Sequence, residues 1–584
     1  MKKLTGLLLV LGYAYCGKAQ VSNEPYIPCQ EIPDLIQRYN ADYRSLFSFY
    51  SPHKGNFWRP RNVNDVDGSS EEKLQRLKKC NDEYLSKLAS VDFGRLPQEC
   101  KVDYILFKRD VVENNRKITA CLDNYKPLSI IFSYENIIYD IGKQRRRGGG
   151  FDYEKAAFQF DSIAKRITKL DTVLARSNFS LIQLKLATDK VDDLTNTIDW
   201  VHQFYNGYNP QYSWWMKKPN EALKTALSSL KTQIIANEKK YQFNDGSNII
   251  GVPIGLDGLK TQLKYEMIPY TPDELVALAN KEFAWCDKEM LRASQEMGFG
   301  NDWKAAVEKV KKTYVPVGEQ PALINRLYNE SIAFVKQHDM ITVPPLAEET
   351  WAMDMMSPEM QRVNPFFLGG NEITISYPTD DMSESDKLMS MRGNNPHFSR
   401  STVFHELIPG HNLEFFMNAR NRTYRDYDTP FWIEGWSLYW ELLMWDTGFP
   451  QSPEDRIGML FWRMTRCARI IFSLNYHLGK WSPQQCIDFL VDRVAYERAN
   501  AEGEVRRSFE GRYSPLYQVG YLVGGQQLLS LKNELVGSKK MTLKQFNDKV
   551  IQLNCMPIEM LRAILTEQKL DKDFQTQWRF YDKL

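Results

Sequence analysis

We expect the helices of this chain to assemble around Val403-Phe404-His405-Glu406-Leu407-Ile408-Pro409-Gly410-His411-Asn412-Leu413-Glu414. The stretch holds two of the seven histidines, a glutamate directly after the first of them, and a Pro-Gly pair. Neutral imidazoles are the commonest zinc ligands, and metallopeptidases keep their general base at the position that Glu406 occupies. The pattern predicts a metal site in which His405 and His411 bind the ion and Glu406 is the base.

The spacing of the two histidines departs from the usual pattern. They are six positions apart, whereas a regular zinc-binding helix separates them by four. At about 100° per residue, six positions leave the imidazoles about 240° apart on an unbroken helix. Pro409 cannot donate to the His405 carbonyl and Gly410 accepts unusual dihedral angles, so we predict a bulge or kink that restores a shared face. The alternative is that a helix ends at Pro409 and His411 lies in the following turn.

A third ligand is available in Pro430-Phe431-Trp432-Ile433-Glu434-Gly435-Trp436-Ser437-Leu438-Tyr439-Trp440-Glu441. This run is apolar and aromatic on nearly every side, which predicts a buried helix opened by Pro430. Glu434 and Glu441 share a face, and buried carboxylates need a cation. We expect Glu434 to bind the ion and Glu441 to orient a ligand histidine. The alternative is that both glutamates pair with arginines such as Arg463, Arg466 or Arg469.

Two of these runs belong to a larger set of four motifs, which are Arg392-Gly393-Asn394-Asn395-Pro396-His397-Phe398-Ser399, His405 to His411, Glu434 to Tyr439 and Pro515-Leu516-Tyr517-Gln518-Val519-Gly520-Tyr521. With them, the chain from about Tyr265 onward resembles the family called domain of unknown function 885, which is grouped with zincin-type metallopeptidases. The resemblance implies a gluzincin-like site in which His405, His411 and Glu434 hold one zinc ion and Glu406 is the base. Where many relatives have Asp-x-Gly-x-His, this chain has Ser473-Leu474-Asn475-Tyr476-His477, so it departs from the family at the acidic partner of His477.

Zinc peptidases also need a hydrogen-bond donor for the oxyanion of the tetrahedral intermediate, and a tyrosine or a histidine supplies it. Tyr517 is the preferred candidate because it lies in a family motif, and His477 is the second. The other interpretation of the repeat formed by Tyr513, Tyr517 and Tyr521 is an aromatic face packed in the core. The nearby glycines predict close helix packing; they are Gly520, Gly524 and Gly525.

Residues outside the ligand set are further candidates. Asn395 precedes the metal helix in a loop-forming context and is a candidate for substrate contact. His397 is expected to cap or support the site, with substrate contact or metal binding as the alternative. Arg466 lies in the helical run from Arg456 to Leu478 and is a candidate for binding a peptide terminus or for pairing with Glu441.

The N-terminus has the pattern of an export signal. Lys2 and Lys3 precede the apolar run Leu4 to Val10, and small residues before Gln20 suit a signal peptidase. Residues 1–19 are therefore predicted to be a signal peptide, and the protein to be periplasmic or extracellular. A lipoprotein anchor at Cys16 is the less favoured interpretation. No later run of about 20 uncharged apolar residues predicts a stable membrane span.

Charge and cysteine content exclude several classes of protein. With 75 basic and 73 acidic residues, the net charge of +2 gives no electrostatic case for a nucleic-acid partner. No C-x-x-C pair is present, which excludes a zinc ribbon. Cys80, Cys100 and Cys121 lie in one helical region and are candidates for a disulfide, with buried free thiols as the equal alternative. The oligomeric state is not predictable from these features.

The periodicity predicts a mainly α-helical protein with a small β-sheet beside a zincin-like metal-binding cleft. A shift toward Gly and Pro near residue 250 divides an N-terminal helical region, 20–250, from a zincin-like catalytic region, 251–584. Thr271-Pro272-Asp273-Glu274 predicts a helix start. Ile341 to Pro345 and Glu372 to Tyr377 look extended, and the second is either a substrate-facing strand edge or an ordinary hairpin arm.

These observations predict an exported zinc-dependent peptidase that contains one Zn²⁺ ion and acts on a peptide substrate. In the expected reaction Glu406 takes a proton from the attacking water and passes it to the leaving amine. Two alternatives remain, a zinc hydrolase of non-peptide amides or esters, and a metal-free helical binding protein with a vestigial motif.

Overall fold

The computed structural model describes residues 30–51, 70–361, 364–376, 378–510 and 513–581. The predicted signal peptide, with Cys16, lies outside these residues, and so does Tyr377. The described chain is mainly helical with a small two-stranded sheet, which confirms the predicted fold class. Among the described helices, none is both long enough and apolar enough to cross a bilayer.

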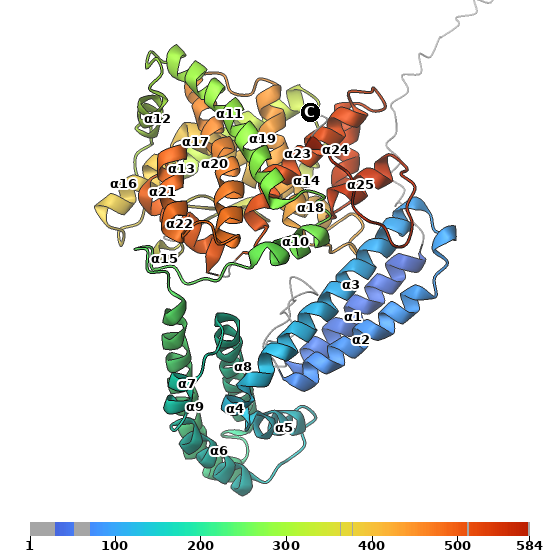
Figure 1. Ribbon diagram of the computed structural model, residues 1–584, viewed down its shortest axis with the longest axis vertical. Helices are drawn as coiled ribbons and strands as arrows, with labels where there is room; N and C mark the ends of the chain where they lie inside the picture. The colour runs from blue at the N-terminus through green and yellow to red at the C-terminus, as the bar shows by residue number, and fades with distance from the viewer. Residues whose placement is uncertain (1–29, 52–69, 362–363, 377, 511–512, 582–584) are drawn as a thin grey trace, which may run out of the picture.

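The N-terminal part consists of two groups of helices. Helices α1 to α3 pack on one another, and their buried side chains share one hydrophobic core with residues 249–581. Helices α4 to α9 have a separate core, and Figure 1 shows them below the larger body. The bounds are α1 Glu31–Tyr50, α2 Glu71–Ala89, α3 Gln98–Tyr125, α4 Ser129–Phe132, α5 Glu135–Arg145, α6 Tyr153–Ile167, α7 Asp171–Arg176, α8 Leu181–Tyr205 and α9 Pro210–Glu238.

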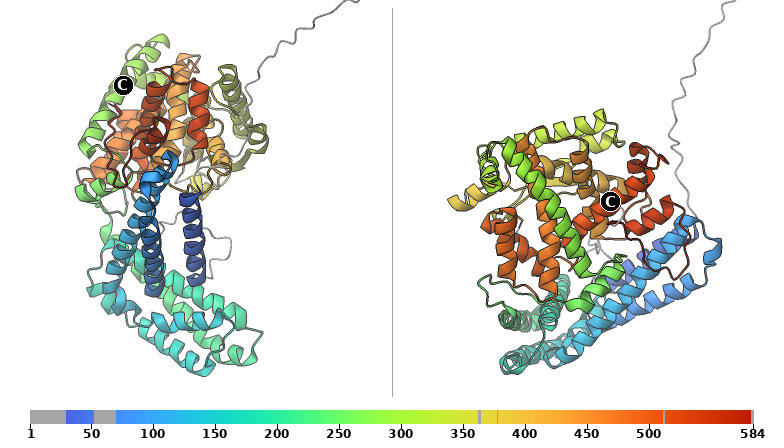
Figure 2. Two further views of the ribbon diagram at one scale, coloured as in Figure 1. Left: turned by 90° about the vertical axis from the view of Figure 1, so that its right-hand side faces the viewer. Right: turned by 45° about the horizontal axis from the view of Figure 1, so that its top comes forward.

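The remaining helices form the larger body, which the turned views of Figure 2 show from two further sides. Helix α11 begins as predicted, because Thr271 and Glu274 form a reciprocal capping box. The bounds before the metal motif are α10 Gly255–Tyr265, α11 Pro272–Glu296, α12 Trp303–Lys311, α13 Gln320–Gln337, α14 Pro345–Thr350, α15 Pro358–Gln361 and α16 Glu384–Gly393. From the motif onward they are α17 Pro396–Glu406, α18 His411–Asn418, α19 Pro430–Asp446, α20 Pro453–His477, α21 Pro483–Val494, α22 Arg498–Phe509, α23 Tyr517–Leu535, α24 Leu543–Gln552 and α25 Ile558–Leu565.

The sheet pairs β1, Ala352–Met355, with β2, Glu372–Ile375, in parallel. The predicted alternation holds in β2, since Ile373 and Ile375 are buried. In the segment predicted to be extended, Ile341 to Pro345, the backbone of Pro344 is extended, but the segment forms no strand. Pro344 and Pro345 lack backbone donors for a ladder, and Pro345 instead opens α14.

Helices α19 and α23 pack closely at the centre of the larger body, as the glycines predict. A Cβ atom on Gly524 would lie 2.9 Å from the Gly435 Cα atom and would overlap the Phe431 carbonyl oxygen. A Cβ atom on Gly520 would lie 2.8 Å from the Pro430 carbonyl carbon. Because α19 carries Glu434 and α23 begins at Tyr517, this contact brings the two candidate residues together.

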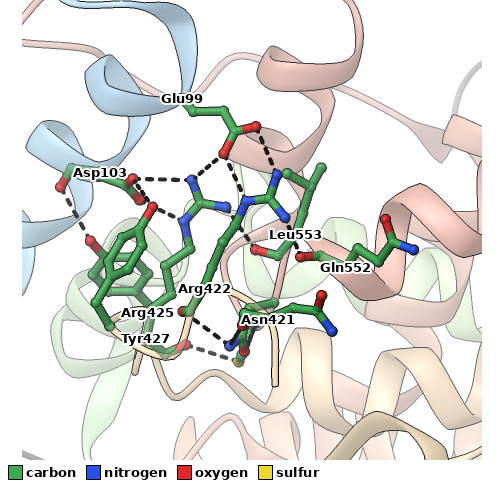
Figure 3. Close-up of polar contacts among 11 residues, drawn as sticks. Glu99, Asp103, Asn421, Arg422, Arg425, Tyr427, Gln552 and Leu553 are labelled. Carbon is green, nitrogen blue, oxygen red and sulfur yellow. Dashed lines mark hydrogen bonds and ion pairs between the residues drawn. The ribbon is translucent and has the colours of Figure 1, made fainter. Parts of the chain in front are cut away.

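A buried ionic network ties α3 to the segment that leads into α19 (Figure 3). The Arg425 guanidinium donates to Asp103 at 2.7 Å and to Glu99 at 2.9 Å, and Arg422 also donates to Glu99. Both arginines donate in addition to backbone carbonyls, those of Gln552 and Leu553. The segment before Pro430 is therefore held from two sides, which fixes where α19 begins.

The cysteines of the N-terminal region differ in whether they form a disulfide. Cys80 and Cys121 are buried and are not in disulfides, whereas Cys100 is disulfide-bonded. Cys80, Cys100 and Cys121 are therefore not bonded to one another.

Candidate metal centre

The metal motif is split between two helices. Helix α17 ends at Glu406, the Ile408–Pro409 peptide bond is cis, and α18 begins at His411. Gly410 is required in this turn, because a Cβ atom there would lie 2.6 Å from the carbonyl carbon of His405. The predicted bulge within one helix is therefore wrong. The helix ends, as in the alternative interpretation, but His411 opens a second helix instead of lying in a turn.

This break brings the two imidazoles to a common point with Glu434. One donor atom from each of His405, His411 and Glu434 lies within 4.8 Å of the other two, and all three residues are buried. The Glu434 Oε2 atom lies 3.5 Å from His405 Nε2 and 3.3 Å from His411 Nε2. Within the described residues this buried oxygen has no hydrogen-bond donor. The three side chains therefore form a candidate site for a cation.

Carboxylates on the far side of each ring set its orientation. The His405 Nδ1 atom lies 2.7 Å from Glu441 Oε1, which also accepts a hydrogen bond from Arg466 at 2.9 Å. Glu441 thus contacts His405 and pairs with an arginine at once, so features of both interpretations of the sequence are present. The His411 Nδ1 atom lies 3.4 Å from Glu414 Oε2. Both rings therefore turn their Nε2 atoms toward Glu434.

Glu414 is a further buried carboxylate beside His411, and the motif predicted no role for it. The available signal was its position three residues after His411, which places both side chains on one face of α18. Glu414 is fully buried, and burial raises the pKa of its carboxyl group to about 7.

Burial and charge act in opposite directions on the ligands. Burial lowers the pKa of His411, but the Glu434 carboxylate outweighs this and holds that pKa well above its ordinary value. Burial similarly lowers the pKa of His405, and contacts with Glu434 and Glu441 raise it overall. Burial raises the pKa of Glu434, yet the two histidines hold it well below its usual range. Glu434 is therefore ionised, whereas the raised pKa values of the two histidines favour their protonated form, so a cation bound here would have to displace those protons.

Glu406 ends α17 beside this cluster. It is 9% exposed, and its carboxylate makes no hydrogen bond within the part of the chain that the structure describes. Burial raises the pKa of its carboxyl group, while the charges of His405 and His411 oppose that rise. The carboxylate is thus free to accept a proton at the edge of the cluster.

The two oxyanion candidates lie in different surroundings. The Tyr517 hydroxyl donates a short hydrogen bond to Glu434 Oε1, and its ring stacks on Tyr513 with centroids 4.0 Å apart. His477 is buried against Tyr476 and Phe509, and neither of its ring nitrogens has a partner among the described residues. Burial lowers the pKa of His477 to about 4. Tyr517 therefore touches the cluster, whereas no described contact links His477 to it.

The other candidates make structural contacts. Asn395 caps α17, because its side chain accepts from the His397 and Phe398 amides at 3.1 and 3.0 Å. His397 Nδ1 lies 2.7 Å from Asp455 at the start of α20. Arg466 is 3% exposed and pairs with Glu441. Asn395 thus caps the N-terminal end of α17, and His397 ties that end to the N-terminal end of α20. Arg466 supports the cluster through Glu441.

Comparison with known proteins places the chain among relatives of unknown function. The solved structure of a "putative lipoprotein of unknown function" from Shewanella oneidensis is 17% identical and has a TM-score of 0.65. It covers 92% of this chain and 99% of its own. A "putative lipoprotein" from Colwellia psychrerythraea is 15% identical, with a TM-score of 0.57 over 92% of this chain and 98% of its own. At these identities the likeness shows a shared fold. No curated protein matches the chain.

A family model matches most of the sequence, from residue 59 to residue 565, and so includes the cluster and all four motifs. The chain therefore belongs to the family described as bacterial protein of unknown function, DUF885.

Proposed function

We propose that this protein is an exported zinc-dependent peptidase in which His405, His411 and Glu434 hold one Zn²⁺ ion and Glu406 is the general base. The observation that carries the proposal is the convergence of the three donor atoms beside a buried carboxylate that has no hydrogen bond among the described residues.

The donor set fits zinc. Two imidazoles and one carboxylate are a usual protein ligand set of catalytic zinc sites, whereas Mg²⁺ and Ca²⁺ favour oxygen ligands. Bonds of about 2.1 Å in a tetrahedron separate neighbouring donors by about 3.4 Å. The separations of 3.3 and 3.5 Å between Glu434 Oε2 and the two Nε2 atoms agree with that value. An ion at this point would also satisfy the unpartnered Glu434 oxygen.

When bound, zinc lowers the pKa of a coordinated water and polarises a carbonyl group. Glu406 accepts a proton from the attacking water and delivers it to the leaving amine, a role for which its raised pKa is suited. Glu441 and Glu414 hold the two histidines in orientation. Of the oxyanion candidates, Tyr517 is better placed than His477, because its hydroxyl already reaches Glu434.

A peptide substrate is favoured by the strand beside the cluster. The loop before β2 packs against Glu406 through Gly369, so β2 lies next to the base. Because β2 is already paired with β1 on one side and with Leu368 on the other, an extended peptide backbone would have to pair with the exposed strand β1, at the other edge of this small sheet. We also propose, as the resemblance implies, that this family belongs with the zincin-type peptidases.

Export is supported by three observations. Residues 1–19 have the pattern of a signal peptide, Cys100 is disulfide-bonded, and both structural relatives carry the word lipoprotein in their names. Disulfides persist in oxidising compartments outside the cytosol.

The test uses the purified full-length mature chain. We expect one zinc ion per chain by elemental analysis, and cleavage of a mixed peptide library read by mass spectrometry. Glu406→Gln should keep the zinc and lose most turnover, whereas the surface variant Glu384→Gln, with a side chain 91% exposed, should keep both. Absence of bound zinc would favour the metal-free binding protein, and cleavage of esters but no peptides would favour the non-peptide hydrolase. Full turnover by Glu406→Gln would refute the role of the base.

A further inference from the structure

We propose that Gly369 and Asn412 form a clamp that positions the carboxylate of Glu406. The inference rests on the proposed function, since it concerns the residue that we assign as the base. Gly369 and Asn412 are positioning residues, because they act on the reaction through Glu406.

Glu406 needs such a device. A general base has to be held within about 0.5 Å of its productive position, and hydrogen bonds from neighbours usually do this. Glu406 has none in the described chain, so packing has to hold it. The neighbour that packs on it is the backbone of Gly369.

The contact between Gly369 and Glu406 is close at three points. A Cβ atom on Gly369 would overlap Glu406 Oε2 and would lie 2.8 Å from the Glu406 carbonyl oxygen and 2.9 Å from its Cα atom. Two of these three atoms are backbone and cannot rotate away. The backbone of Gly369 thus packs against both the Glu406 carboxylate and the end of α17. Any larger residue at position 369 would push this loop away from Glu406.

Asn412 holds the loop around Gly369 in place. The loop Leu368 to Asn371, here called the clamp loop, is closed by paired hydrogen bonds of 3.0 and 2.8 Å between Leu368 and Thr374. The Asn412 side-chain amide donates to the carbonyls of Gly370 at 3.2 Å and Asn371 at 2.9 Å. Asn412 directly follows the ligand His411 on α18.

The clamp therefore joins three parts of the site. Helix α18 carries a metal ligand, the clamp loop leads into β2, and Gly369 abuts the base at the end of α17. Since Asn412 belongs to the same helix as His411, movement of the loop relative to the ligand would move the carboxylate too. This arrangement sets the base relative to the metal without a polar contact to the base.

The first test needs no activity and reads the contact itself. Gly369→Ala should lower the urea midpoint of unfolding by clearly more in the wild-type background than in a Glu406→Ala background, where the overlapping oxygen is absent. Equal shifts in the two backgrounds would overturn the contact of Gly369 with the Glu406 carboxylate, on which the clamp depends. Asn412→Asp should raise hydrogen exchange in residues 368–371, and unchanged exchange there would overturn the clamp. If Gly369→Ala fails to fold, Asn412→Asp carries the decision.

The second test reads the role in turnover by the zinc-loaded protein. Gly369→Ala should lower kcat by about 100-fold, the size expected for a misplacement of about 1 Å, with zinc content and KM nearly unchanged. Asn412→Asp should act in the same direction. Added to Glu406→Gln, either change should cause no further loss. The remote control Gly150→Ala, with no atom within 4 Å of the added Cβ, should keep full kcat.

Three results would overturn the clamp as a positioning device. These are loss of zinc from either variant, a rise of KM in place of a fall in kcat, and an equal proportional loss in the Glu406→Gln background. A wild-type protein that binds no zinc or cleaves no peptide refutes the proposed function instead, and the unfolding and exchange measurements then decide the clamp alone.

Discussion

Replacing Glu441 by glutamine tests whether this residue tunes the metal ligand His405. The carboxylate is 5% exposed and lies between His405 Nδ1 at 2.7 Å and Arg466 at 2.9 Å. Glutamine keeps the shape of the side chain but removes its charge. The His405 ring then loses the negative partner that raises its basicity and fixes its orientation.

The expected loss follows from this geometry. Removing the partner of a ligand histidine weakens metal binding by about 10- to 100-fold, which is about 1.4 to 2.7 kcal/mol. The change also leaves Arg466 buried without a full counter-charge, which costs about 3 to 5 kcal/mol of unfolding free energy. Zinc affinity is measured by competition with a chromophoric chelator at fixed pH, and stability by urea unfolding of the metal-free chain.

The matched control is Glu282→Gln. Glu282 is 8% exposed and accepts from Arg463, which lies on α20 as Arg466 does, but it touches no ligand. Both variants should lose stability, and Glu441→Gln alone should lose zinc affinity. The reasoning is refuted if Glu441→Gln binds zinc as tightly as the wild type, or if Glu282→Gln weakens binding equally.

Three further predictions concern stability. Burial lowers the folded-state pKa of His477 to about 4, below its unfolded value of about 6.5, so stability is full above pH 6.5 and falls by about 3 kcal/mol toward pH 4. His477→Gln should flatten that part of the curve of unfolding free energy against pH, and an unchanged slope would contradict the assignment. Gly524→Ala should cost about 3 kcal/mol in urea unfolding, because the new Cβ meets Gly435 and the Phe431 carbonyl; a loss under 0.5 kcal/mol would show that α19 and α23 separate freely. Removing zinc with a chelator should lower the melting temperature, with about 4 kcal/mol lost at a zinc concentration of 1,000 times Kd, and an unchanged melting curve would argue against a structural link to the ion.

Much of the helical architecture and the meeting of His405, His411 and Glu434 were predictable, because they depend on short-range features. Thr271 and Glu274 mark a helix start within four residues, and the glycines around Gly524 mark the face that packs on α19. The convergence of His405 and His411 was also foreseen. Its cause differs from the predicted bulge. Helix α17 ends at Glu406 and α18 begins at His411, because a Pro-Gly pair can end one helix and let the next begin in a new direction.

Long-range contacts were harder to foresee. Asn395 and Arg466 are polar residues in motifs, and a single sequence does not tell a side chain that faces a ligand from one that caps a helix or pairs with a glutamate. The contact of Gly369 with Glu406 joins segments far apart in the chain, and no local pattern marks it. Ile341 to Pro345 failed for a local reason, since two prolines favour a helix start over a strand.

The charge of the buried cluster is the strongest reason to expect an ion at this place. Four carboxylates meet around the two imidazoles, those of Glu406, Glu414, Glu434 and Glu441, and the pKa values of the first two are raised by burial. Arg466 pairs with Glu441, and its charge also acts on Glu406. If salt bridges to arginine or lysine balanced all of these carboxylates, a second buried arginine or lysine would lie beside Glu434. Instead, the described contacts of Glu434 are with two histidines and a tyrosine. Without an ion, protons on His405 and His411 balance Glu434, as the raised pKa values of the two histidines indicate, and a divalent cation at the Glu434 oxygen would take the place of those protons.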